Sequence, residues 1–213
     1  MHFAIPFHKY AGRAALGGLL VLAATLRPLA ASAHFEGDGW SWGGGHNLLW
    51  INYDNNCSPF TGVADSAAGG WTATSTPIVF SKQPSGCSPM DQPVDIFTGY
   101  DSNATALAWT QNYERDCFIS CWWDADWDDT VEHSVIRLNT AVDGNNFGFS
   151  TLSGANQQAV VTHEMGHSLG MAHAGYYAGE SVGAYSIMDY CCFGYSTPQT
   201  HDVNDVNALY PGW

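Results

Sequence analysis

The segment from His163 to His173 strongly constrains the fold, because two histidines recur at helical spacing and a third follows a glycine. His163 and His167 are four residues apart, so on a helix their side chains point to the same side. Gly170 follows within one turn, and glycine readily takes the left-handed conformation that ends a helix and reverses the chain. The sequence therefore predicts a helix that ends near Gly170 and a return of His173 toward the other two histidines.

Three converging imidazoles are typical of a catalytic zinc site, which keeps a fourth position open, whereas structural zinc sites close all four. We therefore expect His163, His167 and His173 to ligate zinc. Glu164 is expected to reach a water molecule at the metal without being a ligand, and to act as general base and then as general acid. A bare His-Glu-x-x-His pattern also occurs by chance in ordinary helices, but the third histidine and the glycine argue against chance here.

The pattern H-E-x-x-H-x-x-G-x-x-H, followed by a methionine turn, resembles the signature of the metzincin metalloproteases. Ser186 to Tyr190 is similar to that turn, in which Met188 would form an apolar floor beneath the three histidines. The resemblance implies a zinc endopeptidase with an α+β fold: a twisted five-stranded mixed sheet, an active-site helix and a C-terminal helix. It extends over residues 34–213, which we expect to form one catalytic domain.

Two features of the sequence point to different subfamilies. The Ser-x-Met-x-Tyr form with Tyr190 resembles astacins and serralysins, whose tyrosine hydroxyl binds the zinc or stabilises the oxyanion. That resemblance makes Tyr190 a candidate catalytic residue; the alternative is an ordinary buried or exposed tyrosine of the turn. The segment from Asp202 to Tyr210 is instead similar to the closing helix of matrixins, so the subfamily stays open.

Residues 1–33 have the features of an export signal. Lys9 and Arg13 precede an apolar run from Ala14 to Leu26, and Ala31-Ser32-Ala33 fits a signal-peptidase site. The apolar run is too short to span a bilayer as a helix, and no other stretch approaches that length. We therefore expect a secreted, extracellular protein without stable membrane association.

The charge of the chain after residue 33 is strongly acidic. All 20 acidic residues lie there, against only three basic ones: Lys82, Arg115 and Arg137. Such a surface argues against nucleic acid and anionic membranes as partners. The expected partners are protein or peptide substrates, and we expect a monomer.

Six cysteines, all after residue 33, predict disulfide bonds in an oxidising compartment, with the pairing left open. A cysteine-based metal site is the alternative, but Cys117-x-x-x-Cys121 has no second matching pair. The carboxylates clustered between Asp116 and Asp129 raise the possibility of bound calcium. Their spacing matches no known loop, so a disulfide-pinned surface insertion is the favoured interpretation.

Periodicity and turn residues predict the secondary structure. The expected strands are Leu48–Tyr53, Pro77–Phe80, Val94–Thr98, Thr105–Thr110 and Ser134–Leu138, and the expected helices are Val63–Thr74, Asn156–Leu169 and one from Thr200 that stops at Pro211. The fourth strand, around Ala106 to Ala108, aligns with the edge strand along which metzincins pair an extended peptide.

Two other function classes compete with an active peptidase. A catalytically inactive, zinc-binding relative would serve as a binding or inhibitory module, but such relatives commonly lose the residue that corresponds to Glu164. A disulfide-rich structural protein with incidental histidines would bind no stoichiometric zinc. The intact motif favours the peptidase.

Overall fold

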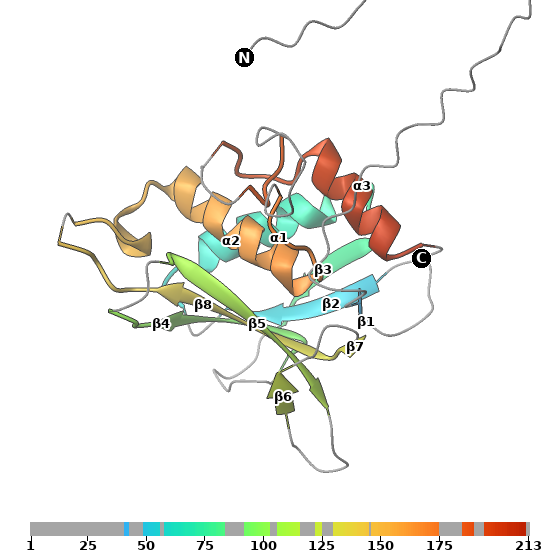
Figure 1. The fold of residues 1–213 in the computed structure, drawn as a ribbon, viewed down its shortest axis with the longest axis horizontal. Helices are drawn as coiled ribbons and strands as arrows, with labels where there is room; N and C mark the ends of the chain where they lie inside the picture. The colour runs from blue at the N-terminus through green and yellow to red at the C-terminus, as the bar shows by residue number, and fades with distance from the viewer. Residues whose placement is uncertain are drawn as a thin grey trace, which may run out of the picture.

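The computed structural model describes residues 41–42, 49–55, 58–83, 92–102, 106–115, 122–124, 130–144, 146–174, 185–189 and 194–211. Its elements are β1 (Ser41–Trp42), β2 (Leu49–Asp54), α1 (Thr61–Thr72), β3 (Ile78–Lys82), β4 (Val94–Gly99), β5 (Ala108–Arg115), β6 (Trp122–Asp124), β7 (Thr130–Val131), β8 (His133–Asn139), the 3₁₀ turn η1 (Phe149–Thr151), α2 (Gly154–Ser168) and α3 (Thr200–Leu209) (Figure 1).

The main sheet has the strand order β3-β2-β4-β8-β5-β6. The first four strands run parallel, and β5 and β6 are antiparallel to their neighbours. Strand β8 is buried along most of its length, as expected for a parallel strand covered on both faces. The predicted α+β fold with a five-stranded mixed sheet is confirmed, and the three-residue strand β6 extends the sheet by a sixth strand beside β5.

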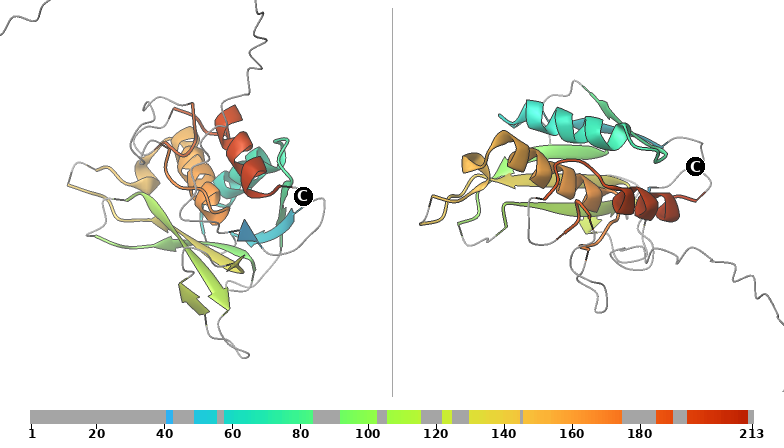
Figure 2. Two further views of the ribbon diagram at one scale, coloured as in Figure 1. Left: turned by 45° about the vertical axis from the view of Figure 1, so that its right-hand side comes forward. Right: turned by 90° about the horizontal axis from the view of Figure 1, so that it is seen from above.

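Helices α1 and α2 lie side by side over one face of the sheet (Figures 1 and 2). The buried side chains of α1 recur at the spacing of one helical face: Ala64, Ala67, Ala68 and Trp71. Trp71 is fully buried, and its indole Nε1 donates to the carbonyl oxygen of Thr162 in α2 at 3.0 Å. This contact ties the two helices together one residue before His163.

The fourth predicted strand is displaced in the structure. It was expected over Thr105–Thr110 with a polar connection after it, but β5 begins at Ala108 and continues to Arg115, and β6 follows. The strand was predicted to end at Thr110 because polar residues follow, but the side chain of Asn112 faces helix α2 and donates to the carbonyl oxygen of His167. The other predicted strands and all three helices coincide with observed elements to within a few residues.

No helix in the described part of the chain is long and apolar enough to cross a membrane. The predicted export signal, residues 1–33, lies outside the described residues, as do all six cysteines. Of the acidic segment Asp116–Asp129, the structure describes only the backbone of β6. The division at residue 34 therefore stays a prediction.

Candidate metal centre

Helix α2 places the first two histidines of the motif on its last two turns. The helix begins after Ser153, whose hydroxyl accepts a hydrogen bond from the amide of Asn156 at 3.3 Å, so Ser153 is the N-cap. Val161 and Met165 are fully buried, which fixes the rotation of the helix about its axis. His163 and His167, four residues apart, consequently point to the same side of the helix.

A left-handed glycine then reverses the chain. Gly170 has φ of 88°, its amide donates to the carbonyl oxygen of His167 at 2.9 Å, and the amide of Met171 donates to that of Gly166 at 3.1 Å. These two bonds form the Schellman motif that ends helices at a glycine. The predicted reversal at Gly170 is confirmed, and it brings His173 back over the end of α2.

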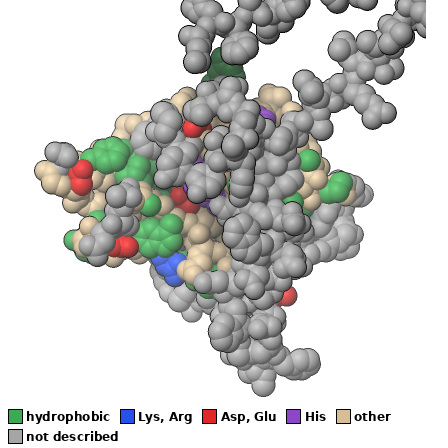
Figure 3. Space-filling view, in the orientation of Figure 1, with side chains coloured by type: hydrophobic (Ala, Val, Ile, Leu, Met, Phe, Trp, Pro, Cys, Tyr) green, Lys and Arg blue, Asp and Glu red, His purple; other side chains and the backbone are tan. Residues whose placement is uncertain are grey.

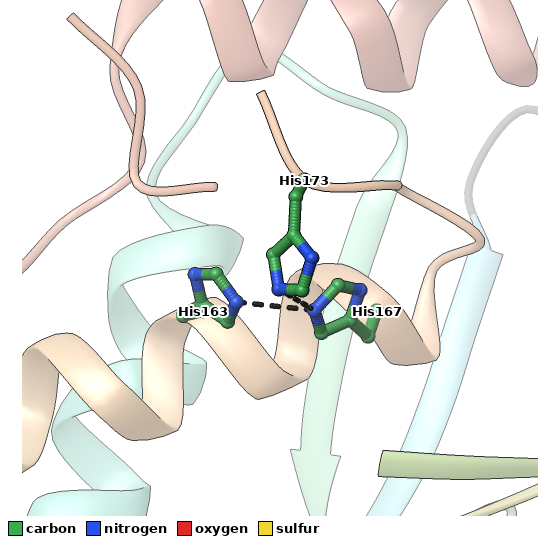
Figure 4. Close-up of side chains that lie close together, drawn as sticks. All are labelled: His163, His167 and His173. Atoms are coloured by element: carbon green, nitrogen blue, oxygen red, sulfur yellow. Dashed lines mark hydrogen bonds between the residues drawn. The ribbon is translucent and has the colours of Figure 1, made fainter. Parts of the chain in front are cut away.

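The three imidazoles converge on one point (Figure 4). The Nε2 atom of His167 lies 3.0 Å from that of His163 and 3.1 Å from that of His173. A tetrahedral ion with bonds of about 2.0–2.1 Å to nitrogen sets its ligand atoms about 3.3–3.4 Å apart. The spacing therefore fits a single ion held by the three rings.

The other ring nitrogens determine which tautomer is present. His163 Nδ1 lies 2.8 Å from the carbonyl oxygen of Ile187, and His167 Nδ1 lies 2.7 Å from that of Met171. Because a carbonyl oxygen only accepts, each Nδ1 must carry the hydrogen, which leaves a lone pair on each Nε2. Two lone pairs about 3 Å apart repel each other unless a cation lies between them, so the donor set fits a metal ion.

Burial keeps these rings neutral. It lowers the pKa of His163 to about 4 and that of His167 well below the ordinary value, and it also lowers the pKa of His173. The neighbouring histidines lower the pKa of His167 further. Neutral imidazole is the form that binds a metal, so at neutral pH no proton has to be displaced.

Glu164 lies beside the histidines and is 6 % exposed. Its carboxylate Oε2 accepts a hydrogen bond from the Thr110 hydroxyl at 2.7 Å, across from strand β5. On the face of the molecule in Figure 3, histidine and acidic side chains reach the surface near the middle. The carboxylate is thus held against strand β5 in a nearly dry environment, one position after His163 in the chain.

Met188 packs against Gly166, which lies between His163 and His167 in α2. A side-chain carbon on Gly166 would overlap the sulfur of Met188 and would lie 3.4 Å from the Trp71 ring, so a larger residue there would require Met188 to shift. The segment that carries Met188 is held next to the third histidine, because the amide of Ala174 donates to the Met188 carbonyl oxygen at 2.8 Å. Met188 is thus buried against the last turns of α2, and its role as a floor beneath the three histidines stays a prediction.

Three residues that sequence reasoning missed hold this arrangement in place. Asp202 in α3 is fully buried; its carboxylate accepts from the Ser186 hydroxyl at 2.5 Å and from the Ile187 amide at 2.9 Å. Asn112 on β5 donates to the His167 carbonyl oxygen at 3.1 Å. Thr110 is the third. Only Asp202 left a signal in the sequence, since it occupies the N3 position of a helix, where a carboxylate accepts backbone amides.

The structure brings together His163, His167 and His173, whereas Tyr190 lies outside the described residues. His133 is buried and far from the motif in sequence, with its Nε2 3.4 Å from Oδ2 of Asp95. Most of the loop from Ala174 to Ser186 is also outside the described residues.

Residues 143–202 match the model of a family described as dual-action HEIGH metallo-peptidases. The matched segment contains all three histidines, Glu164 and Met188, and the chain has His-Glu-Met-Gly-His where the family name has isoleucine. The chain is a metallopeptidase. The predicted recognition is confirmed at the level of a metallopeptidase, and the family implies a metal ion.

Solved structures give similar folds at low identity. A structure of myroilysin has a TM-score of 0.46 and 16% identity, covering 80% of this chain and 95% of the other. High choriolytic enzyme 1, a hatching enzyme zinc-protease of the medaka fish Oryzias latipes, has a TM-score of 0.42 and 12% identity, covering 81% and 94%. At these values the similarities carry no inference about chemistry. A search of curated proteins finds no match for the metallopeptidase.

Proposed function

We propose that the metallopeptidase is a secreted zinc endopeptidase in which His163, His167 and His173 hold the metal. The observation that carries this proposal is that the Nε2 atoms of three histidine rings converge. In two of these rings, His163 and His167, the hydrogen is on Nδ1, so Nε2 offers a lone pair. Imidazole suits zinc, and three protein ligands leave one position for water or substrate.

Glu164 would carry the proton transfers. The chemistry that a zinc ion supplies at such a site is Lewis acidity, which lowers the pKa of water and polarises a carbonyl group. Glu164 accepts a proton from the attacking water and later donates it to the leaving amine, so it serves as general base and then as general acid. No side chain acts as a nucleophile, and the peptide bond is hydrolysed without a covalent intermediate.

The substrate would bind along the outer edge of β5. In an antiparallel pair, residues that bond to the partner strand alternate with residues whose backbone groups point away from it. The Asn139 amide donates to the Leu107 carbonyl oxygen at 2.9 Å. With the observed β5–β8 register, the residues whose backbone groups point away from β8 are Ala108, Thr110 and Asn112.

Among the described strands, none pairs with that outer side before Tyr113, where β6 begins its pairing. An extended peptide can therefore add a strand there, beside α2. The acidic composition argues against nucleic acid as a partner and favours neutral or basic peptides. Pairing along the edge of β5 would in addition recognise the backbone of a peptide.

Several finer assignments accompany the proposal. Tyr190 would stabilise the negative charge that develops on the carbonyl oxygen. The six cysteines would form disulfides after export, and residues 1–33 would be removed. Calcium at the carboxylates of Asp116–Asp129 is a separate proposal, tested by whether calcium raises the unfolding temperature.

The function is tested with the purified protein and a library of quenched-fluorescent peptides, with N-terminal processing read by mass spectrometry. We expect cleavage that a chelator abolishes and that one equivalent of zinc restores. Zinc bound at one per chain with no cleavage of any peptide would favour an inactive binding module instead. Failure to bind zinc would refute the metal site.

A further inference from the structure

Thr110 lies on the edge strand, with its side chain directed at helix α2. It is half-buried, and its hydroxyl oxygen is 2.7 Å from Oε2 of Glu164 and 3.0 Å from the Glu164 carbonyl oxygen. The two residues are 54 positions apart in the chain, so this contact is set by the packing of β5 against α2.

The direction and strength of the bond follow from its chemistry. An ionised carboxylate only accepts hydrogen bonds, so the hydroxyl of Thr110 is the donor. Hydrogen bonds to a charged acceptor are shorter and stronger than those between neutral groups, and 2.7 Å is in the range for a hydroxyl donor. Because Glu164 is 6 % exposed, little water competes for this carboxylate oxygen. The bond therefore fixes how the carboxylate is turned about its last torsion.

The backbone of the same residue faces the outer edge of β5. From the pairing of Asn139 with Leu107, the amide and carbonyl groups of Thr110 point away from β8. An extended peptide that pairs along this edge would thus meet the backbone of Thr110, while the side chain of Thr110 holds the base.

We propose that Thr110 is a positioning residue that aligns the Glu164 carboxylate with the substrate backbone. This inference rests on the proposed peptidase function and deepens it. Its consequence is that any small shift of the edge strand moves the substrate and the base together. Catalysis depends on such alignment, because small misplacements of a base lower the rate steeply.

The strand should keep its place when the hydroxyl is removed. Asn112, two residues along the same face, donates to the His167 carbonyl oxygen at 3.1 Å and accepts from the Ser134 hydroxyl at 2.5 Å. These bonds hold β5 against the end of α2 independently of Thr110. A change at Thr110 therefore tests the base and leaves the metal ligands in place.

The experiment compares Thr110→Val, Thr110→Ala and Thr110→Ser in the zinc-loaded full chain. Serine and alanine both lose the methyl group and differ only in the hydroxyl, so this pair remains informative if the valine variant fails to fold. Thr140→Val is the matched control, because Thr140, directly after β8, is also half-buried and its hydroxyl donates to the Gly99 carbonyl oxygen at 2.9 Å.

We expect kcat to fall about 10- to 100-fold in the valine and alanine variants, with KM within about twofold of wild type. Serine should restore most of kcat, and Thr140→Val should leave it unchanged. Zinc affinity, measured by competition with a chelator, should be the same in all variants. In crystals of the metal-free protein, Glu164 should keep one side-chain conformation with serine and take more than one with alanine.

Two results would overturn the inference. If wild type cleaves peptides, Glu164→Gln does not, and Thr110→Ala is as active as Thr110→Ser, the positioning role is wrong while the peptidase stands. If zinc-loaded wild type cleaves no peptide, the proposed function fails and the inference fails with it.

Discussion

Asp202 offers a demanding test of how the metal centre is supported. Its buried carboxylate accepts three hydrogen bonds, from the Ser186 hydroxyl at 2.5 Å, the Ile187 amide at 2.9 Å and the Gln199 amide at 2.6 Å. Ile187 in turn offers its carbonyl oxygen to His163 Nδ1 at 2.8 Å. Removing the carboxylate should therefore destabilise the fold and loosen a metal ligand together.

The cost of Asp202→Ala can be estimated from these partners. The Ile187 amide is buried and would lose its acceptor, at about 1–3 kcal/mol. The Gln199 amide would lose its capping partner at about 1 kcal/mol, and water can reach it in part because Gln199 is half-buried. With the lost Ser186 bond, the free energy of unfolding should fall by about 3–5 kcal/mol. For a chain of this size, that lowers the unfolding temperature by about 6–20 °C.

The assay is thermal unfolding together with zinc affinity for Asp202→Ala, Asp202→Asn and the control Asn207→Ala, an exposed position on the same helix. Asparagine keeps one acceptor oxygen and should cost about half as much as alanine. Both aspartate variants should bind zinc more weakly, and the control should match wild type. An alanine variant with wild-type stability and zinc affinity would refute this account of the support beneath His163.

Three further predictions concern packing, pH and the metal. Gly166→Ala should lower the free energy of unfolding by about 1–3 kcal/mol in denaturant titrations because its new carbon meets Met188, whereas Gly154→Ala, in open space, should not. Burial lowers the pKa of His133 to about 4 in the fold from 6.5 when unfolded. The unfolded chain therefore binds the proton first, and stability present above pH 6.5 is lost as the pH falls toward 4; His133→Gln should flatten that dependence in urea titrations at pH 7 and 4.5. Chelation should lower the unfolding temperature of wild type and of Glu164→Gln by the same amount, because Glu164 is not a ligand and the variant keeps all three histidines. Added zinc should restore the unfolding temperature of both proteins.

Much of the fold follows from local patterns in the sequence. The buried face of α1 repeats at helical spacing, and the strands β2, β4 and β8 are apolar runs where they were expected. The reversal at Gly170 was predictable because a single glycine at a helix end has few alternatives. These features depend on residues close together in the chain.

The missed features depend on distant residues. Strand β5 was predicted to end too early because polar residues such as Asn112 follow Thr110, and only the contact of Asn112 with α2 explains why its polar side chain faces inward. The bonds from Ser186 and Ile187 to Asp202 likewise connect the segment that carries Met188 to helix α3, which lies elsewhere in the chain. No periodicity encodes such contacts, because they arise only once the sheet and helices have packed.

Glu164→Gln tests the central claim most directly. Glutamine keeps the shape of the side chain and can still accept from Thr110, but it cannot take up a proton at neutral pH. The measurement is zinc content and peptide turnover of this variant beside wild type, with Glu132→Gln as an exposed control. The account predicts one zinc per chain in all three proteins and a loss of kcat of at least about 100-fold in Glu164→Gln alone. Wild-type turnover by a zinc-loaded Glu164→Gln variant would contradict the account.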